Sequence, residues 1–179
     1  NFPTMLCFST FSWNFELAYK FAILAKKQNP KVVTIFGGPN FPTIQDEKLE
    51  FLRQRPGIDF FVELEGELGF VDLVENLGDH GLCASRLKKD ETKVTNTSYL
   101  LEERLISGPL QRIKDINVIP SPYLTGALDD YFNFSLVPMI ETTRGCPFTC
   151  TFCTDGLAIK GKIKRYDAER TKEELNYIA

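Results

Sequence analysis

The sequence lacks any apolar run that approaches the roughly 18 residues of a membrane-spanning helix. No secretory signal peptide is visible in these residues, and their formal net charge of −3 creates no field that would draw the chain to nucleic acid or anionic lipid. With 43% hydrophobic and 25% charged residues, its 179 residues suffice for one soluble domain and part of another. We therefore expect a cytoplasmic protein whose partners are neither membranes nor nucleic acids. Because the chain begins at Asn1 rather than at methionine, we expect it to be a piece of a longer protein.

Disulfide-type cysteine spacing is also absent. Of the five cysteines, Cys146, Cys150 and Cys153 fall within one short stretch. A disulfide framework instead spreads its cysteines to close long loops. The clustering favours a reducing compartment and thiols that act together.

Strand-like and helix-like stretches alternate along the first half of the chain, with a period of about 25 to 30 residues that is typical of βα units on a parallel sheet. The expected strands are Thr4–Thr10, Lys31–Phe36 and Ile58–Leu64, and the expected helices lie within Asn14–Pro30, Ile44–Arg55 and Glu67–Gly78. A sheet of this kind has helices on both faces. A doubly wound sheet would need at least one strand more, so we expect the first unit to be missing.

Local signals refine these expectations. In the first helix, Leu17, Phe21 and Leu24 recur at helical spacing, and Asn14 is a suitable N-cap. We expect Gly78 to cap the third helix and Cys7 to lie in the core.

The second half is less regular. The polar stretch Leu87–Leu100 predicts a loop or small hairpin, and a proline-rich and glycine-rich segment predicts a linker over residues 116–133. Strand character resumes at Phe134–Thr143, and Asp167 can cap a final helix. We therefore expect an α/β domain over residues 1–115 and the start of a second domain over residues 134–179.

The stretch RGCPFTCTFC, Arg144–Cys153, places three cysteines in the spacing C-x-x-x-C-x-x-C. Thiolates hold iron–sulfur clusters, and three of them can hold three corners of a four-iron cluster. The fourth iron then stays open for chemistry. Gly145 lets the backbone turn sharply before the first cysteine.

This motif, with an aromatic residue before its last cysteine, resembles that of the radical S-adenosylmethionine (SAM) enzymes. The resemblance implies that Cys146, Cys150 and Cys153 ligate a 4Fe–4S cluster and that Phe152 lies near the adenine of SAM. It further implies that SAM chelates the fourth iron, that its reductive cleavage yields a 5′-deoxyadenosyl radical, and that a flavodoxin or ferredoxin donates the electron.

The first domain offers a second candidate site. Because ligands of open parallel sheets bind at the carboxyl ends of the strands, a site is expected near Ser9, Gly37, Gly38 and Gly66, small residues that permit close approach. The order of these segments before the cysteine motif resembles the cobalamin-binding branch of the radical SAM enzymes.

This second resemblance includes specific matches and departures. The matching positions are Ser9, Trp13, Asn14, Gly37, Gly38, Pro39, Glu65, Gly66 and Glu67. Leu64 stands where relatives often have glycine. The Asp-x-His-x-x-G motif, which supplies an axial histidine in other cobalamin proteins, is absent.

The resemblance implies a truncated doubly wound, Rossmann-type cobalamin-binding sheet followed by the first βα unit of a partial (β/α) TIM-like barrel. It implies a cobalamin-dependent methyltransferase that transfers a methyl group to an unactivated carbon of a small-molecule or peptide substrate.

Two alternatives stay open. One is a zinc-stabilised α/β binding module without redox chemistry, with a fourth ligand from Cys7, Cys83 or His80, since His80-x-x-Cys83 has a usable spacing. The other is a radical enzyme whose first domain binds only substrate or partner.

Overall fold

The computed structural model describes residues 4–132, 137–153, 156 and 158–179. The chain divides into two units, Asn1–Arg112 and Ile113–Ala179. None of the helices in the described ranges is long and apolar enough to cross a membrane.

A five-stranded sheet organises the first unit, with its strands in the order β1-β2-β3-β4-β5. Its strands are β1 (Met5–Ser9), β2 (Val33–Gly37), β3 (Phe60–Val62), β4 (Thr97–Leu101) and β5 (Arg104–Ser107). β2 pairs parallel with both β1 and β3, whereas β4 pairs antiparallel with both β3 and β5. The predicted α/β fold is thereby confirmed, and the sheet is mostly parallel. The polar stretch expected to be a loop or small hairpin contributes β4, which forms a hairpin with β5 and extends the sheet.

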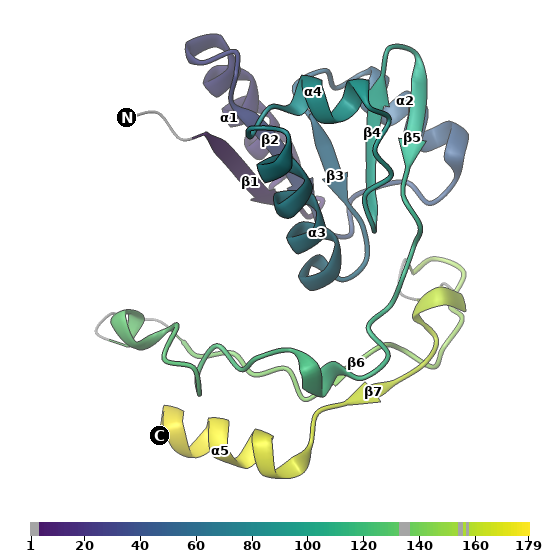
Figure 1. Cartoon of the computed structure of the whole chain (residues 1–179). Coiled ribbons are helices and arrows are strands. Elements are labelled where there is room, and N and C mark those ends of the chain that lie inside the picture. Colours follow the sequence, from purple (N-terminus) through teal and green to yellow (C-terminus); the bar gives the residue numbers. More distant parts are fainter. Residues whose placement is uncertain (1–3, 133–136, 154–155, 157) are drawn as a thin grey trace. The chain divides into compact units, whose positions relative to one another are not determined.

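The helices cover both faces of this sheet (Figure 1). They are α1 (Phe15–Gln28), α2 (Gln45–Arg53), α3 (Gly66–Asp79) and α4 (Ala84–Lys89). Side chains alternate along a strand, so Phe60 and Val62 pack in the core under α3 and α4, while Phe61 packs in the core under α1 and α2. β3 is a continuous apolar run and β2 is apolar except at the buried Thr34, because both faces of these strands are covered.

Helix α1 turns its small residues toward the sheet. Ala18 and Ala22 are buried, whereas Leu17, Phe21 and Leu24 are 60%, 56% and 54% exposed. The helix is confirmed, and its apolar stripe faces outward because the alanines allow closer approach to the strands.

Two local expectations are wrong. Cys7 is exposed, because β1 pairs only with β2 and is therefore an edge strand of the described sheet. Gly78 lies inside α3, whose C-cap is His80. The next glycine, Gly81, takes the positive φ of 66° that ends the turn.

The second unit has less regular structure. It contains short 3₁₀ turns at Ile116–Val118, Asp129–Tyr131 and Ala158–Lys160, the two-residue strands β6 (Thr143–Arg144) and β7 (Lys164–Arg165), and helix α5 (Ala168–Ile178). Asp167 stands at the N-cap position of α5, as expected, but its side chain makes no capping hydrogen bond to the helix. The strand expected over Phe134–Thr143 is not found in residues 137–142, and residues 134–136 lie outside the described ranges. Since β6 pairs antiparallel with β7, the first unit of a barrel is not confirmed and stays a prediction.

Candidate functional site

The carboxyl ends of the three parallel strands meet at one edge of the sheet. Ser9 is in register with Gly37, and Gly37 with Val62, so the ends of β1, β2 and β3 form one row. Ser9 and Gly38 are exposed, and Gly37 is half-buried. The structure therefore brings together the strand-end residues that the sequence singles out.

Gly38 is required by the fold itself. Its φ is 109°, and a Cβ atom there would lie 2.3 Å from the carbonyl oxygen of Thr10. The Thr10 amide and hydroxyl both donate to the carbonyl oxygen of Gly37, at 2.7 and 2.8 Å. These contacts join the loops after β1 and β2 and explain Gly38 without any ligand.

Asn14 fixes the first of these loops. Its side-chain oxygen accepts from the Phe11 amide at 2.7 Å, and its side-chain nitrogen donates to the Ser9 carbonyl at 3.0 Å. Asn14 does stand at the N-cap position, yet its side chain makes no capping bond to α1. It stabilises the loop instead.

The loop between β3 and α3 is held by a buried ion pair. Arg112 Nε lies 2.7 Å from Glu65 Oε1, and Glu65 is 5% exposed. Leu64 has a φ of 58°, a conformation in which glycine is favoured, so the leucine that replaces glycine here adopts a backbone conformation uncommon for its type. Gly66 begins α3, and a Cβ atom there would meet nothing within 4 Å.

A buried charge network underlies this edge, and the sequence pattern did not indicate it. Lys48 of α2 is 2% exposed, and its Nζ lies 2.5 Å from Glu63 Oε2. Ser98 of β4 donates to Glu63 Oε1 at 2.6 Å and shares a hydrogen bond with Ser107 of β5. The only available signal was an acid directly after an apolar strand, and the partner of such an acid cannot be read from periodicity.

Exposed aromatic side chains lie beside the strand ends. The rings of Phe11 and Trp13 stack with centroids 4.7 Å apart and planes 7° apart, and Trp13 is 79% exposed. A flat aromatic surface beside small, exposed residues suits a large planar ligand. On this observation, the residues at the edge fit the corrin ring of cobalamin.

The cysteine loop lies between β6 and β7. Gly145 has a φ of 108°, and a Cβ atom there would lie 2.5 Å from the Lys162 carbonyl oxygen. The Cys146 amide donates to the Lys160 carbonyl at 3.2 Å, so the base of the loop is closed by backbone contacts. Gly156 is similarly constrained, since a Cβ atom added there would lie 2.6 Å from the Cys150 carbonyl oxygen.

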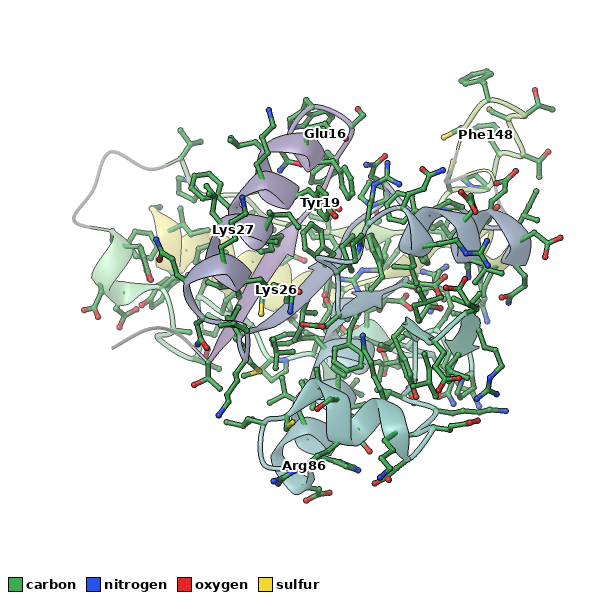
Figure 2. The ribbon with its side chains drawn as sticks, turned by 90° about the horizontal axis from the view of Figure 1, so that it is seen from above. Glu16, Tyr19, Lys26, Lys27, Arg86 and Phe148 are labelled. Carbon is green, nitrogen blue, oxygen red and sulfur yellow. The ribbon has the colours of Figure 1, made fainter. Side chains whose placement is uncertain are left out.

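The donor set of this loop fits an iron–sulfur cluster. Cys146, Cys150 and Cys153 are free thiols, of which the first is half-buried and the others are exposed. Within the described ranges, no three His, Cys, Asp or Glu side chains converge as metal ligands, so the thiols would have to turn toward one another. Phe152 is 91% exposed, and Phe148 stands out from the ribbon (Figure 2).

The suggested zinc ligand His80 is already engaged. Its Nδ1 lies 2.6 Å from the Asn76 carbonyl oxygen and its Nε2 lies 3.2 Å from Asp90 Oδ2. Cys83 is hydrogen bonded to Ser85 at 3.2 Å. Neither side chain is directed at a shared metal position.

Comparison with known proteins finds relatives that match nearly the whole chain. The chain is 33% identical over 99% of its length to 2-(S-pantetheinyl)-carbapenam-3-carboxylate methyltransferase of Streptantibioticus cattleyicolor. It is 31% identical, also over 99%, to the cobalamin-dependent radical SAM methyltransferase TokK of Streptomyces tokunonensis. It covers 26% of the length of each of these relatives. No family model matches the chain.

The fold comparison agrees. The structure of the cobalamin-dependent S-adenosylmethionine radical enzyme OxsB matches 99% of this chain with a TM-score of 0.67, at 22% identity and over 23% of that protein. At this identity the match concerns the fold alone. The resemblance noted from the sequence is confirmed: nearly the whole chain is similar to about a quarter of the length of these cobalamin-dependent radical SAM enzymes.

Proposed function

We propose that this chain is part of a radical SAM enzyme that uses cobalamin to transfer a methyl group to an unactivated carbon. The observation that carries the proposal is the loop of three free thiols, Cys146, Cys150 and Cys153, in a chain whose first unit brings the ends of three parallel strands to one edge. When bound there, a 4Fe–4S cluster would supply the electron for reductive cleavage of SAM.

The residues of the loop have distinct roles in this proposal. The three thiols would hold the cluster, and the backbone contacts of Gly145 and Gly156 would keep the loop in a single path. Phe152, which is 91% exposed, is available to cover the adenine of SAM. A low-potential donor such as flavodoxin or ferredoxin would reduce the site.

Measuring bound metal tests the first half of the proposal. Each of Cys146, Cys150 and Cys153 is replaced by alanine in the intact protein, and iron and sulfide are measured after anaerobic reconstitution. We expect each variant to lose most of its iron, while Cys7→Ala and Cys83→Ala retain it. Wild-type iron in all three variants, or zinc as the metal found, would contradict the cluster.

The strand-end residues would hold cobalamin. Ser9, Gly37 and Gly66 leave room for the corrin ring, and the exposed Trp13 ring can stack on it. The choice of test variant follows from the geometry. Gly38 cannot be enlarged without displacing Thr10, so Gly38→Val would disturb the loop as well as the ligand. At Gly66 an added Cβ atom would meet nothing within 4 Å, so substitution there disturbs the loop less and tests the ligand more directly.

Equilibrium dialysis with hydroxocobalamin measures whether the open position Gly66 lies at the cobalamin site. We expect Gly66→Val to weaken binding at least about tenfold, a loss of roughly 1.4 kcal/mol. Gly78→Val is the matched control, since Gly78 lies near the other end of α3 and is equally open. No saturable binding to the wild-type protein would leave the first unit as a scaffold or a site for another partner.

A further inference from the structure

A cavity of about 610 Å³ lies at the opposite, amino-terminal edge of the sheet. Its wall includes Val32 and Asp59, which directly precede β2 and β3. The end of α1 and the segment Gly81–Arg86 complete it. Its volume lies within the range of small-molecule pockets, about 300 to 1,000 Å³. It is separate from the strand ends near Ser9, Gly37 and Gly66, which lie at the carboxyl edge.

The wall of this cavity carries an excess of positive charge. Lys26, Lys31 and Arg86 line it, and Asp59 is the one carboxylate among its described lining residues. Asp59 is already engaged, because its Oδ2 accepts from Lys26 Nζ at 2.6 Å and from the Thr34 amide at 2.9 Å. Its Oδ1 also lies 3.7 Å from the Nζ of Lys88, just outside the cavity.

Two of the cations have no such partner. In the described part of the chain, the side chains of Lys31 and Arg86 make no hydrogen bond or ion pair. The guanidinium of Arg86 lies against Gly81, since a Cβ atom at Gly81 would come within 3.2 Å of its Nη1. Figure 2 shows Arg86 on the α4 segment and Lys26 on α1, so cations from two elements line the cavity.

We propose that this cavity binds a small phosphorylated molecule. A guanidinium and an ammonium group together recognise a phosphate, with the guanidinium able to bind two oxygens at once. The cavity is larger than a phosphate ion, and Pro30 and Leu82 offer an apolar wall for an organic group. The ligand class is therefore a phosphate monoester with an apolar portion. This assignment does not depend on the proposed cobalamin or cluster sites.

Cys83 provides a reporter within the same cavity. Hydrogen bonds with Ser85 and with the Arg86 amide lower the pKa of this thiol, which favours the reactive thiolate. Cys7 is exposed but is not among the lining residues, and partial burial raises the pKa of its thiol. Alkylation of the two by iodoacetamide, followed by peptide mass spectrometry, therefore compares a thiol inside the cavity with one outside it.

The test uses phenyl phosphate as the probe, with the intact protein and with ionic strength held constant by sodium chloride. We expect saturable slowing of Cys83 alkylation, by at least about tenfold when the site is full, with no change at Cys7. Lys31→Glu and Arg86→Glu should each raise the half-saturating concentration about tenfold, as expected for the loss of one charge-assisted contact. Lys27→Glu makes the same charge change on α1 outside the cavity lining and should have little effect (Figure 2).

Three outcomes would overturn the proposal. The first is protection of Cys83 that is absent, or still not saturated, at about 10 mM probe. Such a result would mean that the dissociation constant is well above the millimolar value expected from about 4 kcal/mol of binding free energy. The second is equal protection in wild type and in both charge-reversal variants. The third is a Cys83 thiol that reacts only after denaturation, because the cavity would then be covered in the native protein.

Discussion

Lys48 and Glu63 form a buried ion pair with 2.5 Å between Nζ and Oε2, and their side chains are only 3% and 11% exposed. The pair joins α2 to the end of β3, just before the loop that carries Gly66. Removing one member of such a pair leaves an uncompensated charge in the interior, which costs about 3–5 kcal/mol. We therefore expect Lys48→Met to lower the free energy of unfolding by roughly that amount, as measured by urea denaturation.

The double variant Lys48→Met/Glu63→Gln tests whether the charge is the cause. Glutamine can still accept from Ser98 but carries no charge, so we expect the double variant to be more stable than the sum of the two single effects predicts. A coupling of about 2 kcal/mol is typical for residues in contact within a network. Strict additivity would show that packing, rather than the ion pair, governs the loss.

Gly38 and Gly66 should respond differently to alanine even without any ligand. At Gly38 the added Cβ atom would meet the Thr10 carbonyl oxygen at 2.3 Å, and φ is 109°. We expect a loss of about 1–3 kcal/mol there. Gly66 is unobstructed at the start of α3, so Gly66→Ala should change stability by less than about 1 kcal/mol. Thermal melts of the two variants compare them directly, and equal effects would contradict the assigned backbone geometry.

Leu64 should tolerate β-branching poorly. Its φ of 58° lies in the left-handed region, where a β-branched residue is a marked outlier. We expect Leu64→Val to cost about 1–2 kcal/mol in urea unfolding. Leu100→Val is the matched control because Leu100 is also half-buried but lies in β4, where β-branched residues are favoured. A smaller loss at Leu64 than at Leu100 would be inconsistent with the loop conformation.

The loop glycine Gly145 should matter for cluster loading although it carries no ligand. Alanine there would contact the Lys162 carbonyl oxygen at 2.5 Å and would disfavour the φ of 108°. We expect Gly145→Ala to reduce iron bound after anaerobic reconstitution several-fold, while Gly78→Ala, at an open glycine, should not. Full loading of the Gly145 variant would show that the loop accommodates the cluster along another path.

Tyr99 gives a pH dependence with a defined sign. Burial, aided by the negative charge of Glu91, raises the pKa of Tyr99 to about 12 from 10.0. Below pH 10 the phenol is protonated in both the native and unfolded states. Between pH 10 and 12 the unfolded chain loses its proton while the native protein keeps it, so stability falls by about 1.4 kcal/mol for each pH unit. Urea unfolding between pH 9 and 11.5 should show this slope in the wild type and a shallower one in Tyr99→Phe.

The alternation of strands and helices through α3 could be predicted because both periodicities are strong in the sequence. The side chains that cover each face of the sheet could not be predicted in the same way. The apolar stripe of α1 has the right spacing for burial, yet Ala18 and Ala22 pack on the sheet instead. The antiparallel addition of β4 depends on polar residues such as Ser98, whose partner Glu63 is 35 residues away in sequence. Long-range pairing of this kind leaves no local pattern.

The candidate site, like the fold, could be predicted from the sequence only in part. Strand ends locate an edge, so Ser9, Gly37, Gly38 and Gly66 could be identified from the order of elements alone. The sequence could not predict why glycine is needed at Gly38 but not at Gly66. The close contact with Thr10 at Gly38 and the open space at Gly66 are properties of the folded loops. The three cysteines could be singled out as candidate ligands from their spacing. Spacing does not predict how their thiols are arranged, because that arrangement depends on the group they would bind.

The outward stripe of α1 affects how this chain behaves when produced by itself. Leu17, Phe21 and Leu24 add little to the core but place a row of large apolar groups in water, and contiguous surfaces of that kind promote aggregation. Exchanging them for glutamate, lysine and glutamine would raise solubility without disturbing the alanine face that packs on the sheet. Ala22 is 0% exposed, so it cannot be exchanged in the same way: any larger residue would push the helix away from the strands.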